Sequence, residues 1–132
     1  MKLNRRTMLA GAVSAAVAGV TAARAADAKP ADRLRHVVLF KFKDGAAEAD
    51  VRAIENAFRA LAGKISSIRE FEWGTNNSPE GLAQGFTHCF FVTFATAEAR
   101  DAYLPHPDHK AFVELLKPSL DKVLVIDYWA KT

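Results

Sequence analysis

The chain has 132 residues, with 18 Lys and Arg against 15 Asp and Glu and a formal net charge of +3. Four of the basic residues and none of the acids lie in the first 25 positions, so the remainder carries a net charge of about −1. This remainder has no excess of basic residues that would form a binding patch for nucleic acid or for an anionic membrane. The length indicates a single domain.

The first 25 residues have the three regions of a secretory signal peptide. Residues 1–7 carry Lys2, Arg5 and Arg6, residues 8–20 are small and apolar, and residues 23–25 form a small-x-small cleavage site. The apolar run is shorter than the roughly 20 residues that span a bilayer, so we expect cleavage and no membrane span in the mature chain. The adjacent arginines predict a periplasmic or secreted protein exported by the twin-arginine route, with the Sec route as the alternative. Residues 26–33 are expected to be a linker.

The mature chain opens on a predicted strand over residues 34–43, in which His36, Val38 and Phe40 share one face. A helix is predicted over residues 47–62, because its apolar residues recur at the spacing of one buried stripe. Gly63 is expected to end this helix. A second strand is predicted over residues 68–75, and a long loop follows it.

A third strand is predicted over residues 86–94, with His88 and Phe90 on one face and Cys89 on the other. Both faces are largely apolar, which indicates a central strand that is covered on both sides. Cys89 is the only cysteine of the chain, so no disulfide within the chain is available to it. Its apolar neighbours predict a buried, unreactive thiol.

Two more helices and a last strand complete the chain. Thr96 is expected to cap a short helix that reaches Tyr103, Pro107 to start a helix that ends at residue 117, and the last strand to cover residues 122–129. This order predicts an α+β, ferredoxin-like βαββαβ fold with a four-stranded antiparallel sheet. The helices are expected on one face, and the other, still apolar, face is the expected surface of a homodimer.

The segment from Tyr103 to His109 carries the candidate acid/base groups. Pro107 suits the first helical turn, which places His106 at the N-cap and His109 one turn into the helix. Free N–H groups and the helix dipole disfavour a cation there, so His109 is expected to be neutral near pH 7 and able to act as a general base. The alternative is that His106 and Asp108 only cap the helix and that His109 is half-exposed.

His36 and His88 each lie on an apolar face of a predicted central strand, and Phe90 shares the face of His88. A lone histidine in this position is usually a satisfied core residue, but two of them on neighbouring strands make a ligand pocket an equal alternative. Because these strands are expected to be antiparallel, the sequence leaves open whether both histidines share one pocket. His106 and His109 have the spacing of a metal site, but no third ligand is evident, so no metal or other cofactor is predicted.

Five separated motifs occur in a fixed order: residues 34–43, Trp73-Gly74, residues 85–94, Tyr103 to His109, and Asp127-Tyr128. Together they resemble the stress-responsive A/B barrel domain (Dabb) family of the dimeric α+β barrel superfamily. The resemblance assigns residues 34–130 to this domain. It implies a homodimer in which two sheets face each other as a barrel.

The family includes a plant cyclase that closes a linear polyketide thioester by an intramolecular aldol reaction without metal or cofactor. By this resemblance, His109 would remove a proton next to a carbonyl group and Tyr103 would hydrogen-bond the enolate oxygen. The resemblance also matches His36, His88 and His106 to other histidines of that enzyme, and Phe90 is expected in the same ligand pocket. The substrate itself does not transfer.

Three functions therefore remain open. The first is a cofactor-free enzyme that performs acid/base chemistry beside a carbonyl group. The second is a binding module for a small apolar or aromatic molecule. The third is a stress-response dimer without turnover.

Overall fold

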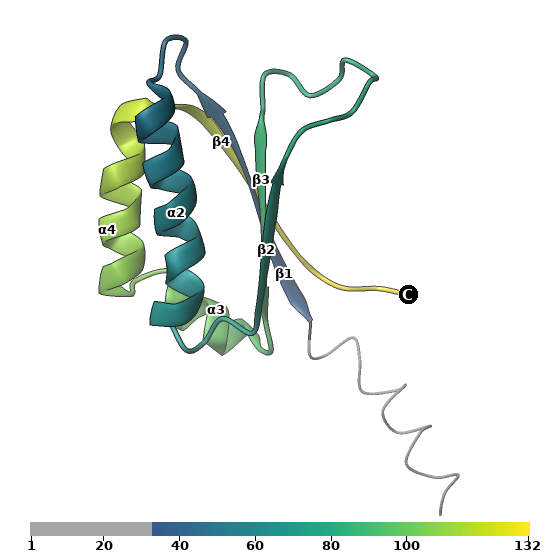
Figure 1. The fold of residues 1–132 in the computed structure, drawn as a ribbon. Coiled ribbons are helices and arrows are strands. Elements are labelled where there is room, and N and C mark those ends of the chain that lie inside the picture. Colours follow the sequence, from purple (N-terminus) through teal and green to yellow (C-terminus); the bar gives the residue numbers. More distant parts are fainter. Residues whose placement is uncertain (1–32) are drawn as a thin grey trace, which may run out of the picture.

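The structure is a computed structural model that describes residues 33–132. The predicted signal peptide, and the predicted linker up to residue 32, lie outside the described residues. The elements follow the predicted order (Figure 1): β1 (Leu34–Phe42), α2 (Glu48–Lys64), β2 (Glu70–Thr75), β3 (His88–Phe94), α3 (Ala97–Tyr103), α4 (Pro107–Leu116), a 3-10 turn (Lys117–Ser119) and β4 (Leu120–Trp129).

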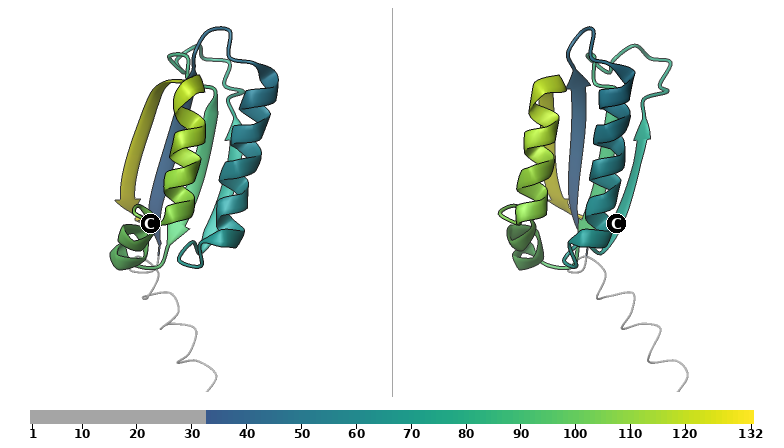
Figure 2. Two further views of the ribbon diagram at one scale, coloured as in Figure 1. Left: turned by 90° about the vertical axis from the view of Figure 1, so that its left-hand side faces the viewer. Right: turned by 60° about the vertical axis from the view of Figure 1, so that its left-hand side comes forward.

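The four strands form one antiparallel sheet in the order β2-β3-β1-β4. Helices α2 and α4 cover one face of it, with α2 over the β2–β3 side and α4 over the β1–β4 side (Figure 2). The loop between β2 and β3 and the C-terminal residues project on the other side of the sheet (Figure 1). The predicted ferredoxin-like α+β fold is thereby confirmed.

Some element boundaries differ from the prediction. Helix α2 continues through Gly63 to Lys64, so the prediction that Gly63 ends the helix is wrong. The helix ends where Ile65 adopts extended backbone and buries its side chain in the core. Three strand starts are displaced by two residues from the prediction: β2 begins at Glu70, β3 at His88 and β4 at Leu120.

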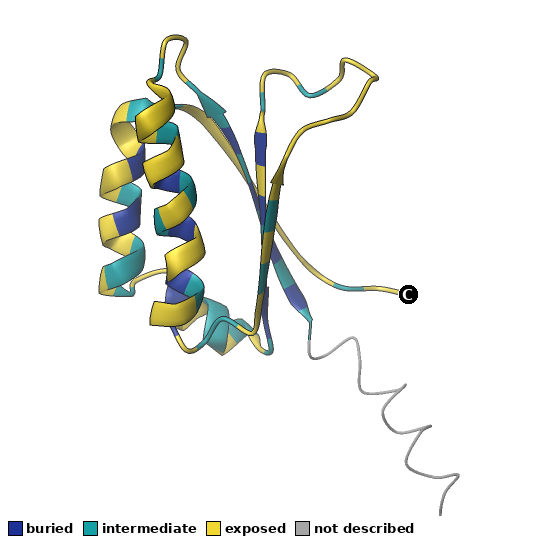
Figure 3. Ribbon diagram, in the orientation of Figure 1, coloured by how far each residue is buried: buried dark blue, intermediate teal, exposed yellow. Residues whose placement is uncertain are grey.

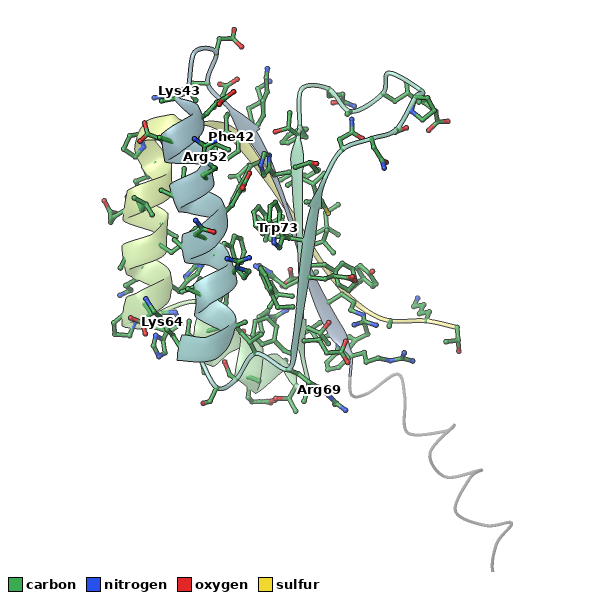
Figure 4. The ribbon with its side chains drawn as sticks, in the orientation of Figure 1. Phe42, Lys43, Arg52, Lys64, Arg69 and Trp73 are labelled. Carbon is green, nitrogen blue, oxygen red and sulfur yellow. The ribbon has the colours of Figure 1, made fainter. Side chains whose placement is uncertain are left out.

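The core between helices and sheet is built largely from aromatic rings. Phe58 of α2 stacks on Phe90 of β3 with ring centroids 4.3 Å apart, and it lies 4.7 Å from the ring of Phe112 on α4. Phe40 of β1 and Trp73 of β2 lie 5.2 Å and 5.5 Å from Phe90. The Trp73 side chain lies on the helix side of the sheet (Figure 4). Interlocked rings of this kind fix how both helices sit on the sheet.

The opposite face of the sheet is open in the single chain, and its β4 part is largely apolar. On β4, Leu124, Ile126 and Tyr128 are 41%, 51% and 44% exposed, and yellow marks this strand as exposed along its length (Figure 3). Cys89 is also exposed on this face, so the prediction of a buried thiol is wrong for the single chain. Partial desolvation and the charge of Glu72 raise the pKa of the Cys89 thiol, which keeps it a weak nucleophile.

Within residues 33–132, no helix combines the length and the apolar character that a membrane crossing requires.

Candidate functional site

A cavity of about 270 Å³ lies between α4 and the β1–β4 side of the sheet. Along α4 it runs from His109 in the first turn to Lys117 just beyond the last, which is about 12 Å at 1.5 Å per residue. His36, Tyr103 and His109 gather at the first of these ends. The apolar lining consists of Val38, Phe40, Phe58, Leu104, Phe112, Val113, Leu116, Leu120, Val123 and Val125.

Tyr103 is the last residue of α3, and it is fully buried. Its hydroxyl has no hydrogen-bond partner among the residues that the structure describes. Its ring centroid lies 4.4 Å from that of His109 and 5.8 Å from that of His36. Burial raises the pKa of the Tyr103 phenol far above its usual value, so the O–H group stays protonated. A buried tyrosine normally has a partner, so this hydroxyl is an unused donor in the cavity wall.

His109 presents a lone pair beside this phenol. Its Nδ1 lies 2.9 Å from the Leu104 carbonyl oxygen. A carbonyl only accepts, so Nδ1 carries the proton and Nε2 of the neutral ring is left as an acceptor. Desolvation by burial lowers the pKa of His109, the bond to Leu104 raises it, and the charges of His36 and His106 lower it further. The net direction is that expected from the helix N-terminus, but burial is its largest cause.

We expect this half-buried imidazole to make the fold less stable in acid. The pKa of His109 is lower in the folded state than its ordinary value of 6.5, so the unfolded chain binds more protons between the two values and stability rises with pH there. Stability should therefore fall as the pH drops below 6.5, and less steeply in His109→Gln. Urea unfolding of the parent and of His109→Gln between about pH 5 and pH 7.5, a range around the ordinary histidine pKa, measures how the free energy of unfolding of each depends on pH. Equal losses in both proteins would contradict it.

His36 is the third polar ring of the cavity. A carboxylate accepts a hydrogen bond from it, and an arginine binds that carboxylate. Its Nδ1 lies 2.7 Å from Oδ1 of Asp127 on the neighbouring strand β4. The other oxygen of this carboxylate accepts from Arg100 of α3 at 3.2 Å. His36 therefore donates from Nδ1, and in the neutral ring Nε2 is an acceptor, as in His109.

His88 lies elsewhere in the fold. It is level with Phe40 on β1, four residues from His36, which corresponds to about 13 Å along the strand. Its Nε2 donates to Glu55 of α2 at 2.8 Å, and its Nδ1 lies 2.8 Å from the hydroxyl oxygen of Thr87. Both ring nitrogens are thus satisfied, and His88 does not line the cavity of His36 and Tyr103.

Glu55→Ala should therefore destabilise the fold without affecting the cavity. The substitution removes the acceptor of the buried His88 Nε2–H, which costs about 1–3 kcal/mol. Glu55→Gln retains an acceptor oxygen and should cost less. Urea unfolding of the two variants compares their losses in free energy of unfolding. Equal losses would show that the hydrogen bond to His88 does not cause the destabilisation.

The two other candidate residues also lie outside this cavity. His106 is the N-cap of α4, and its Nδ1 accepts the N–H of Asp108 at 3.1 Å. Phe90 is fully buried in the aromatic core. Of the six candidate residues, the cavity thus brings together Tyr103, His109 and His36.

A larger hollow of about 460 Å³ lies between the loop after β2 and the sheet, beside Leu39 and Cys89. The one histidine of its lining is His88, whose ring nitrogens are both hydrogen-bonded to other groups. It therefore has no acid/base set comparable to that of the smaller cavity. Within the part of the chain that the structure describes, no three His, Cys, Asp or Glu side chains group to hold a metal ion.

Sequence reasoning missed Asp127 as the partner of His36 and Arg100 as the partner of Asp127. A signal for Asp127 was present, because it is the one acid in the set Val123, Val125, Asp127 and Trp129 that shares a face of the last strand. An acid on an apolar face needs a partner, and His36 is the polar residue of the matching face of β1. Arg100 gave no such signal, because charged residues are common on a short surface helix.

Fold and cavity define a ferredoxin-like α+β protein with a pocket of two histidines and a tyrosine. The family model described as the stress responsive A/B barrel domain matches residues 34–130. The stress-response A/B barrel domain-containing protein HS1 of Arabidopsis thaliana is 41% identical over 95 residues, which cover 72% of this chain and 87% of that protein. The chain belongs to the stress responsive A/B barrel domain (Dabb) family.

Other similar proteins carry more specific names. Olivetolic acid cyclase of Cannabis sativa is 28% identical over 95 residues, covering 72% of this chain and 94% of the cyclase. The structure of a hydroxynitrile lyase from Passiflora edulis has a TM-score of 0.72 and 25% identity, covering 77% of this chain and 96% of the lyase. A Bacteroides fragilis structure described as a dimeric protein with a ferredoxin-like fold has a TM-score of 0.61 and 27% identity, covering 74% of this chain and 96% of its own.

Proposed function

We propose that this protein binds a small carbonyl compound in the cavity of His36, Tyr103 and His109 and performs aldol- or cyclase-like acid/base chemistry on it without a cofactor. The observation that carries the proposal is the buried Tyr103 hydroxyl, which lacks a partner among the described residues and adjoins a neutral imidazole. A carbonyl oxygen of the ligand would accept the hydrogen bond that the protein itself does not supply.

The chemistry follows from the protonation states. Nε2 of His109 takes a proton from the carbon next to the carbonyl group, and the C–H electron pair moves to form the enolate, whose oxygen accepts the Tyr103 O–H. The enolate carbon then attacks a second carbonyl carbon and forms the C–C bond. The His109 imidazolium returns its proton to the new alkoxide oxygen. The step needs no oxidant, reductant or metal, and each proton is accounted for.

The size and lining of the cavity define the ligand class. A volume of about 270 Å³ is near the lower end of small-molecule pockets, and its wall beyond the three rings is nearly all apolar. A small aliphatic or aromatic carbonyl compound fits this lining. The names of two similar proteins, a cyclase and a hydroxynitrile lyase, support turnover over passive binding.

The proposal includes a homodimer that is formed through the open sheet face. The exposed apolar side chains of β4 on this face, and the Bacteroides fragilis structure that is described as dimeric, support this assembly. Export to the periplasm or the exterior by the twin-arginine route is also part of the proposal and rests on residues 1–25 of the sequence. Light scattering of the purified protein and fractionation of expressing cells test these two statements.

A ligand screen by thermal shift tests the cavity. The panel contains small aliphatic and aromatic aldehydes, ketones and diketones, and every hit is repeated with Tyr103→Phe and His109→Gln. A ligand at 100 times its dissociation constant adds about 2.7 kcal/mol, which a thermal shift detects readily. We expect hits that both variants weaken, followed by turnover of the same compounds.

Two outcomes would change this proposal. Hits that depend on Tyr103 and His109 but show no conversion by chromatography would favour the ligand-binding alternative. No hits from the whole panel, with both variants as stable as the parent, would favour a stress-response dimer without turnover.

A further inference from the structure

The carboxylate of Asp127 is shared between His36, which lines the cavity, and Arg100 of α3. One oxygen accepts from Nδ1 of His36 at 2.7 Å, and the other accepts from Arg100 at 3.2 Å. The three residues come from β4, β1 and α3, so this chain joins the short helix to two neighbouring strands. The second partner of Arg100 is the exposed Asp101, which accepts from Nε at 3.1 Å.

We infer that Arg100 is a positioning residue, which holds Asp127 so that His36 keeps its proton on Nδ1 and its Nε2 lone pair available to a ligand. The inference rests on the proposed function, because it assigns His36 as a second proton acceptor beside His109. It concerns a residue that does not itself line the cavity.

The geometry argues for a role beyond stability. The Arg100 and Asp127 side chains are 25% and 24% exposed, and partly exposed ion pairs contribute little to folding. The ion pair also fixes the orientation of the Asp127 carboxylate. A carboxylate with one oxygen on a guanidinium cannot rotate freely, so its other oxygen stays opposite the imidazole and selects one tautomer of the ring.

The charges argue in the same direction. Arg100 holds one oxygen of the Asp127 carboxylate, so the negative charge that faces His36 stays on the oxygen bonded to Nδ1. The other titratable groups around His36 are Tyr103 of α3 and His109 of α4, while β3 places uncharged Val92 and Phe94 beside it. Asp127 is thus the carboxylate that contacts this ring, and Arg100 is a cation that contacts Asp127.

The test is long-range proton–nitrogen NMR of the histidine rings in the purified, nitrogen-15-labelled protein. The four histidines are assigned by replacing each one singly. At a pH where the His36 ring of the parent is neutral, we expect a protonated Nδ1 and an unprotonated Nε2. In Arg100→Gln the unprotonated Nε2 signal of His36 should be lost to a mixture of tautomers. Arg100→Lys, which retains the charge, should restore much of it.

Asp101→Asn is the matched control, because it removes the other carboxylate of Arg100 and should leave His36 as in the parent. A His36 spectrum that is the same in Arg100→Gln and the parent would overturn the inference. If Arg100→Gln does not fold, Arg100→Met, which keeps the apolar part of the side chain, takes its place under the same criterion. The measurement needs no ligand, so a failed ligand screen would count against the proposed function and not against the role of Arg100.

Discussion

Tyr103→Phe should abolish most of the chemistry in the cavity while leaving the fold at least as stable as the parent. The hydroxyl is buried and has no partner among the described residues, so the folded state gains nothing from it. Removing a buried polar group that lacks a hydrogen bond should raise the free energy of unfolding, by up to about 1 kcal/mol. Removing one donor to a developing oxyanion typically lowers kcat by about 10²–10³-fold.

Two measurements on Tyr103→Phe separate function from stability: urea unfolding, and turnover of a compound found in the ligand screen. Tyr128→Phe is the matched control, because the chain has two tyrosines and Tyr128 lies 44% exposed on the other face of the sheet. It should leave turnover unchanged. A loss of stability in Tyr103→Phe would show that the hydroxyl has a structural partner and would remove the main support for the proposed function.

Phe58→Ala should cause the largest loss of stability. The ring is 1% exposed and lies within 4.3 Å to 6.0 Å of four other phenylalanine rings by centroid distance. Deleting a ring in such a position costs about 3–5 kcal/mol, because the packing of α2, α4 and the sheet cannot close around the space. A domain of this size has a total stability of about 5–15 kcal/mol, so the variant should lose a large part of its stability.

We expect a lower urea midpoint for Phe58→Ala, and a substitution on the surface provides the control. Leu82 is 71% exposed in the loop after β2, and Leu82→Ala should change the free energy of unfolding by no more than about 0.5 kcal/mol. Because Phe58 also lines the cavity, the enlarged space should weaken any ligand that packs against it. A change below about 1 kcal/mol in Phe58→Ala would mean that the neighbouring rings repack fully.

Local patterns predicted the elements and both helix caps near the site. Thr96 accepts from the Ala99 N–H at 3.1 Å, and His106 caps α4 with Pro107 in the first turn, as expected. These features depend on residues within four positions of one another, so the sequence specifies them directly. Gly63 was mispredicted because its local preference to end a helix was overridden by the burial of Ile65 in the core.

The candidate site depends on contacts that are distant in the sequence. His36 and Asp127 are 91 positions apart, and the register of β1 against β4 brings them opposite each other. The antiparallel register of β1 and β3 separates His36 from His88, because both lie near the start of a strand and these starts are at opposite ends of the pair. Sequence patterns showed which face each residue occupies, but not its position along the sheet.

The sequence by itself determined the family, the order of elements and the presence of Tyr103 and His109 in one short segment, because these follow from local spacing and separated motifs. Only the tertiary structure decided which other side chains lie beside Tyr103 and His109. It placed His36 at the cavity, with Asp127 bound to His36 and Arg100 bound to Asp127, and it paired His88 with Glu55 of α2. The reason is physical: a hydrogen bond between distant residues depends on strand register and helix packing, and those are set by burial of the whole apolar core.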